Sequence, residues 1–221
     1  MLEAGARGAV VFASGMEEKT ISRQFAPGEK GTLLEYVLDS VWTVADELFV
    51  VFPGEPKLSL IESISPFGVK VLSTQKGKSP VTTICDAFKS ARSEFCLLAT
   101  ERAPLLKPNL VLSLFENARG YDLAVPRWKD GKIEPMLAVY RKNAFTRLVS
   151  SSNPRFGDNV RKEIALLADR LFAVKYVDVE GELKEIDPEL DSFLEVNDEK
   201  SLQAARSKAS IRSKRARTPA K

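Results

Sequence analysis

Short apolar segments alternate with amphipathic segments along most of this 221-residue chain. The apolar segments have the length of buried strands, and the segments between them carry apolar residues at the three- and four-residue spacing of a helix. Strands that alternate with helices predict a mainly parallel sheet covered by helices on both faces. Because parallel crossovers are right-handed, the predicted fold class is α/β, a doubly wound three-layer sandwich. The expected strands are residues 9–13, 48–52, 69–72, 95–99, 123–125, 133–139 and 172–179.

The segments between these strands are expected to be helices. Ser79 is a suitable N-cap for one of them, because its hydroxyl can accept a hydrogen bond from the first turn. The strands at 123–125 and 133–139 flank the turn WKDGK and are expected to pair. We find no internal repeat, so we predict one domain over residues 1–205 and a basic tail over residues 206–221. The expected helices are residues 33–45, 56–64, 80–91, 110–118, 143–149, 160–171 and 201–209.

The chain has no histidine, which removes several kinds of catalytic and metal site at once. Serine or cysteine nucleophiles that need a histidine, and zinc sites that contain one, are excluded. Any chemistry falls to carboxylates, lysine, arginine, backbone amides or a metal held by oxygen atoms. Cys85 and Cys96 lie in apolar segments, where two buried free thiols are favoured over a disulfide or a metal site.

The charge is concentrated at the end of the chain. The formal net charge is +3, but residues 203–221 carry seven basic side chains and no acid, so the remainder sums to −4. The tail lacks aromatic residues and is expected to be disordered and solvated, which is favoured over contact with nucleic acid or an anionic surface. No apolar run has the length of a membrane span and the first residues do not resemble a signal peptide, so we expect a cytoplasmic location.

The loop after the first strand has the small residues of a phosphate-binding loop but an unusual charge. Ligands in doubly wound sheets bind outside the carboxyl ends of the strands, so this loop and the loop after residue 99 are expected at the working edge. A phosphate cradle usually has two or three glycines and no acid. The stretch VVFASGMEEKT, residues 10–20, instead has one glycine, Gly15, beside Glu17 and Glu18.

Six segments in order along the chain resemble the molybdenum cofactor guanylyltransferases, called MobA-like, within the nucleotidyltransferases of the sugar-nucleotide-synthesising type. The resemblance runs from about residue 8 to residue 205 and implies a Rossmann-like nucleotidyltransferase fold. The matching segments are FASGMEEK (12–19), TLLEYVL (32–38), SPVTTI (79–84), ATERAPLL (99–106), VPRWKDGKIEPMLAVYRK (125–142) and FLEVNDEKSL (193–202).

The resemblance implies a nucleotidyl transfer, in which a phosphate on an acceptor attacks the α-phosphorus of a nucleoside triphosphate and pyrophosphate leaves. The leading expectation is transfer of GMP from GTP to a phosphorylated cofactor precursor such as molybdopterin, with a related small phosphate as the alternative acceptor. The protein must align the two phosphates, hold Mg²⁺ through oxygen ligands and neutralise charge on the leaving group. Whether a protein partner completes the site stays an open question at this point.

Matched position by position, the family's paired glycines fall on Ser14 and Gly15, and its arginine falls on Lys19. Its lysine falls on Arg23 or Gln24. Lys19 keeps the positive charge of an arginine without the bidentate fork, and solvated loop charges are the alternative for Lys19 and Arg23. The implied nucleotide-binding residues are Ala13, Ser14, Gly15, Met16, Lys19 and Arg23, and the implied catalytic residues are Lys19, Arg23 and Arg102.

The family's metal-binding aspartate falls on Arg102, with Glu101 beside it. Glu101 reaches the metal position if the chain bulges by one residue, and Asn197 matches a polar oxygen near the metal. Glu101 and Asn197 are therefore the implied Mg²⁺ ligands, whereas Arg102 can stabilise phosphate charge itself. The alternatives are a surface ion pair for Glu101 and Arg102, and a helix N-cap for Asn197 or Asp198.

The base and the activity both stay open at this point. Pro53-Gly54 and residues 73–75 stand where the family often has an asparagine and an aspartate for guanine. One hypothesis is an active transferase. The other is a catalytically impaired relative that acts as a regulatory or partner-binding nucleotide-binding protein, which the altered loop and the missing aspartate favour.

Overall fold

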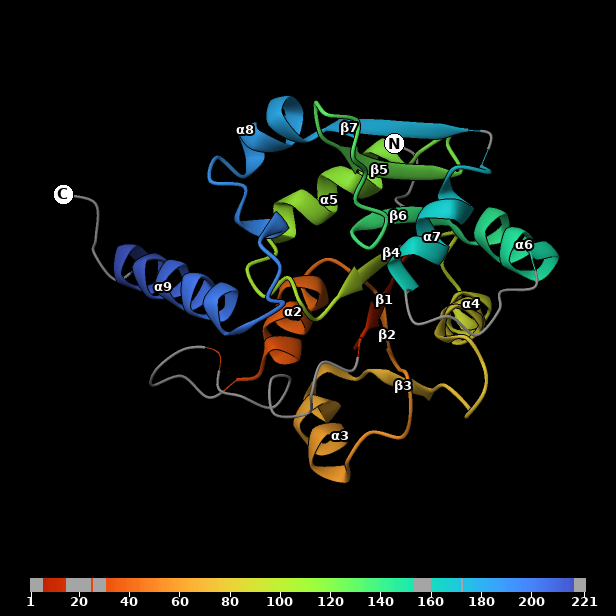
Figure 1. Cartoon of the computed structure of the whole chain (residues 1–221), viewed down its shortest axis with the longest axis horizontal. Coiled ribbons are helices and arrows are strands. Elements are labelled where there is room, and N and C mark those ends of the chain that lie inside the picture. Colours follow the sequence, from red (N-terminus) through yellow and green to blue (C-terminus); the bar gives the residue numbers. More distant parts are fainter. Residues whose placement is uncertain (1–5, 15–24, 26–30, 153–159, 172, 217–221) are drawn as a thin grey trace.

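The core of the protein is a mixed, mostly parallel sheet. The computed structural model describes residues 6–14, 25, 31–152, 160–171 and 173–216. Within these residues seven strands form one sheet in the order β3-β2-β1-β4-β6-β5-β7 (Figure 1). All neighbouring pairs are parallel except those of β6, which is antiparallel to β4 and β5. The predicted fold class is confirmed. The strands are β1 (Arg7–Phe12), β2 (Glu47–Phe52), β3 (Lys70–Ser73), β4 (Phe95–Thr100), β5 (Leu123–Arg127), β6 (Ala138–Arg141) and β7 (Val174–Asp178).

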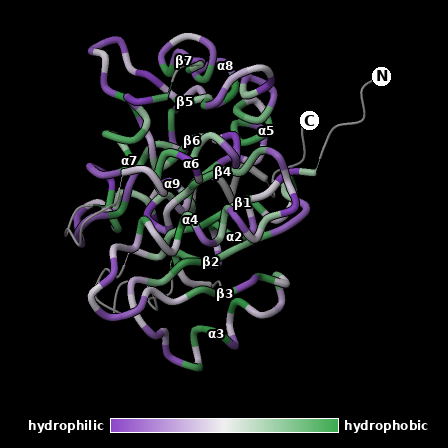
Figure 2. Tube along the Cα trace, turned by 90° about the vertical axis from the view of Figure 1, so that its right-hand side faces the viewer, coloured by the Kyte–Doolittle hydropathy of each residue, from purple (hydrophilic) through white to green (hydrophobic). Residues whose placement is uncertain are grey.

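Helices cover both faces of the sheet (Figure 1). α2, α3 and α5 pack on one face, and α4, α6 and α7 pack on the other. In β1, Ala9 and Val11 belong to the first layer, whereas Val10 and Phe12 belong to the second. A strand covered on both faces is apolar at every position, and Figure 2 shows hydrophobic stretches along the interior strands. The helices are α2 (Leu33–Trp42), α3 (Leu58–Ile64), α4 (Pro80–Ser90), α5 (Pro108–Asn117), α6 (Lys142–Ser152), α7 (Val160–Ala168), α8 (Lys184–Ile186) and α9 (Glu199–Ala216).

Local sequence signals determine where α2 and α4 begin. At α2, Glu35 N donates to Thr32 Oγ1 (3.3 Å) and Thr32 N donates to Glu35 Oε2 (2.5 Å), which is a capping box. At α4, the predicted N-cap Ser79 accepts a hydrogen bond from Val81 N (3.2 Å). An N-cap of this kind contributes about 1 kcal/mol. These caps secure the starts of the two helices.

The hairpin predicted around WKDGK forms, but its second strand is shorter than expected. β5 and β6 pair antiparallel. The strand expected over 133–139 begins only at Ala138. Pro135 has no amide hydrogen for a neighbouring strand, and the chain turns there, with Leu137 N donating to Glu134 O (3.0 Å). The apolar pattern alone therefore overestimated this strand.

α9 corrects the prediction of a disordered tail from residue 206 onwards. The helix continues to Ala216 and lies at one side of the molecule (Figure 1). Arg206 Nε donates to Phe25 O (3.0 Å), and Lys208 Nζ pairs with Asp191. These contacts with distant parts of the chain anchor the helix, which composition alone could not indicate. The last five residues lie outside the described part, and the division into a domain and a tail stays a prediction.

Both cysteines are buried free thiols, as predicted, Cys85 in α4 and Cys96 in β4. Burial raises the pKa of the Cys96 thiol to about 12, so it is protonated at neutral pH. Among the described residues, no helix combines the length and the apolar character needed to cross a membrane.

Candidate functional site

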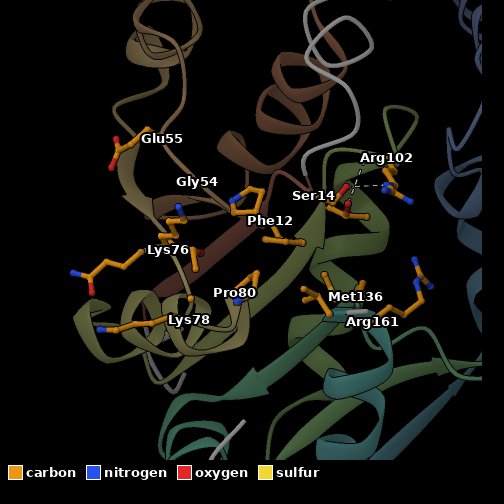
Figure 3. Close-up of a pocket in the computed structure, with 16 residues that line it drawn as sticks. Phe12, Ser14, Gly54, Glu55, Lys76, Lys78, Pro80, Arg102, Met136 and Arg161 are labelled. Atoms are coloured by element: carbon orange, nitrogen blue, oxygen red, sulfur yellow. Dashed lines mark hydrogen bonds between the residues drawn. The ribbon is translucent and has the colours of Figure 1, made fainter. Parts of the chain in front are cut away.

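A cavity of about 740 Å³ opens at the carboxyl ends of β1 to β4, the edge predicted to bind a ligand (Figure 3). Ligands of doubly wound sheets bind at this edge, and the volume is typical of a small-molecule site. Its lining consists of Phe12, Ser14, Pro53, Gly54, Glu55, Thr74, Gln75, Lys76, Gly77, Lys78, Pro80, Thr100, Arg102, Met136, Val160 and Arg161.

The described lining carries more positive than negative charge. Four of its side chains are cationic and one, Glu55, is acidic. Figure 3 shows Lys76 and Lys78 at one end and Arg102 and Arg161 at the other, with apolar side chains between them. This balance favours an anionic ligand that also has an apolar or aromatic portion.

Glu101 fastens the start of the loop after β1 to the end of β4. Its side chain is fully buried. Oε1 accepts hydrogen bonds from Ser14 N (2.9 Å) and Ser14 Oγ (2.6 Å), and Oε2 accepts one from Thr100 Oγ1 (2.8 Å). Burial raises the pKa of Glu101 above its usual value, although the hydrogen bonds and the neighbouring Arg102 oppose this. The carboxyl group thus has a structural role next to the cavity.

Arg102 joins three parts of the chain at the wall of the cavity. Its Nε donates to Ser14 Oγ (2.8 Å), and its Nη1 donates to Asn197 Oδ1 (2.9 Å). Its backbone oxygen accepts a hydrogen bond from Val196 N (2.7 Å). Figure 3 shows the side chain beside Ser14 at one end of the cavity. The guanidinium is therefore held in one orientation by the segments before α9 and after β1.

The loop that carries Arg102 is fastened again at its other end. Lys107 Nζ pairs with Asp187 Oδ1 (2.6 Å), whose side chain is fully buried. Lys107 N donates to Ser192 Oγ (3.0 Å). Burial by itself raises the pKa of Asp187, but Lys107 and Ser192 outweigh burial and hold that pKa below its usual value. Segment 187–197 thus fixes the whole loop after β4.

The residues predicted to hold Mg²⁺ do not fit that role. Both carboxylate oxygens of Glu101 accept hydrogen bonds inside the protein, and Asn197 Oδ1 accepts one from Arg102. Throughout the described part of the chain, no three His, Cys, Asp or Glu side chains are grouped to hold a metal ion. Mg²⁺ usually takes one or two protein carboxylates and completes its shell with water and phosphate oxygens. Glu101 is fully buried and is not among the lining residues of the cavity, so it does not present a carboxylate to such an ion there.

The polar residues of the C-terminal motif FLEVNDEKSL (193–202) make different contacts. Ser201 N donates to Asp198 Oδ1 (2.7 Å), so Asp198 has the N-cap role that the sequence left as an alternative. Asn197 instead faces Arg102. Glu195, in the same motif, pairs with Arg161.

The predicted nucleotide-binding loop is only partly described. Ala13 is buried and its amide donates to Val51 O (2.9 Å), which extends the pairing of β1 and β2. Ser14 lines the cavity. The structure thus brings Ser14, Arg102 and Asn197 together. The other predicted members, Gly15, Met16, Lys19 and Arg23, lie outside the described residues.

Arg161 is a functional candidate that the sequence did not indicate. Its Nη1 donates to Glu134 Oε2 (2.9 Å), and its Nη2 pairs with Glu195. Glu134 also accepts hydrogen bonds from Trp128 Nε1 (2.9 Å) and Lys132 Nζ (2.7 Å). The acidic Glu134 within the hairpin motif was the available signal, but nothing in the sequence connects it with α7.

The loop after β3 supplies further lining residues that the sequence did not single out. Lys76 and Lys78 flank Gly77 there, directly after residues 73–75. Thr74 is nearly buried, and its Oγ1 has no hydrogen-bond partner among the described residues. Because buried polar atoms are normally paired, Thr74 Oγ1 is a candidate contact for a ligand.

Comparison with known proteins agrees with this geometry. Residues 12–163 match the family described as MobA-like NTP transferase domain. A probable molybdenum cofactor guanylyltransferase of Methanosarcina mazei is 28% identical over 204 residues, 89% of this chain and 88% of that protein. The structure of molybdopterin-guanine dinucleotide biosynthesis protein A from Archaeoglobus fulgidus has a TM-score of 0.71 at 22% identity, covering 92% of this chain and 99% of that one.

A second solved structure shows how widely the fold is shared. The 4-diphosphocytidyl-2C-methyl-D-erythritol synthase from Anaerococcus prevotii has a TM-score of 0.67 at 15% identity, covering 94% of this chain and 97% of that one. The fold by itself therefore leaves the base open. The family match is more specific, because it covers more than two thirds of the chain and includes Ser14, Glu101 and Arg102. This chain belongs to the family of MobA-like NTP transferase domains.

Proposed function

We propose that the protein transfers a nucleoside monophosphate from a nucleoside triphosphate to a phosphate-bearing acceptor and releases pyrophosphate. The observation that carries the proposal is the cationic cavity at the carboxyl ends of β1 to β4 in a chain of this family. GTP is the proposed donor and a molybdenum cofactor precursor the proposed acceptor, since the Methanosarcina mazei relative is named a molybdenum cofactor guanylyltransferase. The proposed location is the cytoplasm.

Both ends of the cavity carry cations, and the position of the one carboxylate in the described lining supports one orientation of the donor. Ser14 and Arg102 form the end proposed for the triphosphate. The loops after β2 and β3 form the end proposed for the base. Guanine presents N1–H and amino donors, and Glu55 is the only carboxylate among the described lining residues.

The reaction needs alignment and charge neutralisation more than covalent help from the protein. An oxygen of the acceptor phosphate bonds to the α-phosphorus, while the bond from that phosphorus to the oxygen bridging to the β-phosphate breaks. The electron pair of the broken bond leaves with pyrophosphate, where negative charge grows. Fixed cations at that point stabilise the transition state. Arg161, whose orientation is held by Glu134 and Glu195, is proposed to face the acceptor phosphate.

Nucleotide binding and pyrophosphate release test the proposal in sequence. Thermal unfolding with GTP, CTP or ATP should show a rise in melting temperature, largest for GTP, because a ligand that binds only the folded state stabilises it. Adding molybdopterin should then release pyrophosphate. Arg161→Ala should raise KM for the acceptor more than KM for GTP, whereas the exposed Arg119→Ala serves as the matched control.

Three outcomes separate the functions. Pyrophosphate release that depends on both substrates supports the transferase. Binding of GTP without release, with the acceptor present, would favour the regulatory alternative, which the names of the relatives do not support. If no triphosphate at millimolar concentration shifts the melting temperature, the proposed nucleotide site is refuted.

A further inference from the structure

We propose that the guanidinium of Arg102 takes the place of a protein-held divalent cation at the phosphate end of the cavity, so that the protein binds a nucleoside triphosphate without a metal ion of its own. This inference rests on the proposed function, because it assigns a charge-neutralising group within the same site. It predicts that the nucleoside triphosphate binds with similar affinity whether or not Mg²⁺ is present.

The first support is the orientation of Arg102. Hydrogen bonds to Ser14 Oγ (2.8 Å) and Asn197 Oδ1 (2.9 Å) use two of the five N–H groups of the guanidinium. No hydrogen bond joins its Nη2 to any of the described residues, although Arg102 lines the cavity. Guanidinium N–H groups in a fixed plane match the oxygens of a phosphate. Arg102 is thus an oriented cation with donors to spare.

The second support is that the neighbouring oxygen atoms already accept hydrogen bonds within the protein. Glu101 directs both carboxylate oxygens into the protein, toward Ser14 and Thr100. Asn197 Oδ1 accepts a hydrogen bond from Arg102. A divalent cation at this point would lie beside a guanidinium of the same sign, and the fully buried Glu101 is not among the lining residues of the cavity that could hold it. The described edge is therefore arranged around a cation that belongs to the chain.

The third support is the rigidity of the segment that carries the cation. Val196 N donates to the backbone oxygen of Arg102 (2.7 Å), and the buried ion pair of Lys107 with Asp187 fastens the far end of the same loop. A charge that is held in place before the ligand arrives needs no reorganisation on binding. Arg102 meets this condition through contacts on both sides.

The test compares the affinity for GTP in millimolar EDTA with that in millimolar Mg²⁺, by calorimetric titration of the full chain. Wild type should differ by less than about threefold between the two buffers. Arg102→Ala should weaken binding at least about tenfold in EDTA, since a charge-assisted hydrogen bond contributes that much. Arg102→Asp should lose binding in EDTA and regain part of it with Mg²⁺. The exposed Arg119→Ala is the matched control and should bind as wild type.

The wild-type comparison stands even if an Arg102 variant is unstable, and circular dichroism checks the fold of each variant. GTP binding by wild type that disappears in EDTA would overturn this inference while leaving the proposed function intact. Arg102→Ala that is folded and binds GTP as wild type in EDTA would overturn it too. Failure of every triphosphate to bind in either buffer would refute the proposed function, and this inference with it.

Discussion

Replacing Glu101 tests whether its carboxyl group holds the start of the loop after β1 against the end of β4. Glu101→Ala removes the acceptor for three donors: Ser14 N, Ser14 Oγ and Thr100 Oγ1. The side chain is 0% exposed, so the lost hydrogen bonds are not simply exchanged for bonds to bulk water. The backbone amide of Ser14 cannot turn toward another acceptor, whereas the two hydroxyls can rotate. The change therefore strands at least one buried donor.

The size of the effect follows from these contacts. One buried donor without an acceptor costs about 1–3 kcal/mol, and each remaining hydrogen bond contributes about 1 kcal/mol. We expect Glu101→Ala to lower the free energy of unfolding by about 3 kcal/mol. Glu101→Gln keeps the shape and one acceptor oxygen, so we expect it to cost only about 1 kcal/mol.

Urea unfolding followed by circular dichroism measures these differences. The exposed Glu116→Ala is a matched control, because it removes a carboxylate without a buried donor. The control should stay within about 0.5 kcal/mol of wild type. If Glu101→Ala also stays within that limit, the carboxyl group does not fasten the loop, and the structural role derived for it is refuted.

The pH dependence separates the charge of Glu101 from its shape. Burial raises the pKa of the carboxyl above its usual value of 4.5. A raised folded-state pKa means that the group's contribution to stability is fully present below the unfolded-state pKa and is lost as pH rises through the folded-state pKa. Glutamine does not titrate, so the loss of unfolding free energy caused by Glu101→Gln, relative to wild type, should become smaller as pH is raised from about 4 to about 8. A cost that grows over this range would contradict the raised pKa.

Three further predictions follow from single contacts. Asp187→Asn should lower the free energy of unfolding by about 1–3 kcal/mol at neutral pH, and this loss should become smaller below about pH 3.8, because a lowered pKa gives stability that is lost as pH falls. An unchanged urea midpoint at pH 7 would contradict the buried pair. Thr74→Val should leave the free energy of unfolding unchanged or raise it by up to about 1 kcal/mol, and it should weaken GTP binding about tenfold, since the Thr74 hydroxyl has no partner among the described residues beside the cavity. Undiminished GTP affinity in a titration would exclude Thr74 as a ligand contact. Removing residues 210–221 should leave GTP affinity unchanged, because the described contacts of α9 lie before residue 210. A large loss of GTP affinity would show that this segment takes part in binding.

The strand and helix pattern was predictable because it depends on local periodicity. The strand expected over 95–99 is β4, and the alternation of strands and helices gave the correct fold class. Two segments were misjudged for non-local reasons. The second hairpin strand is shortened by a turn that the Tyr140 hydroxyl stabilises through Pro135 O (2.8 Å). The tail is helical where contacts with Phe25 and Asp191 anchor it.

The candidate site was predictable only as far as strand ends share one edge. Because Ser14 and Arg102 each follow a parallel strand of the sheet, that rule predicts that they lie at the same edge, where they are in contact. It does not indicate Arg161, because this residue lies in α7 and does not directly follow a strand. The sequence also could not show that the Glu101 carboxylate points toward Ser14 and Thr100, because adjacency in sequence does not show which way a side chain points.

The sequence by itself determined the fold class, the edge of the sheet where the candidate site lies and the exclusion of histidine chemistry, because these depend on periodicity and on residue identity. Only the tertiary structure decided what Glu101, Arg102 and Asn197 do. The hydrogen bonds that settle their roles join residues 87 to 95 positions apart. Contacts at that separation depend on how the sheet brings distant loops together, and no local pattern contains that information.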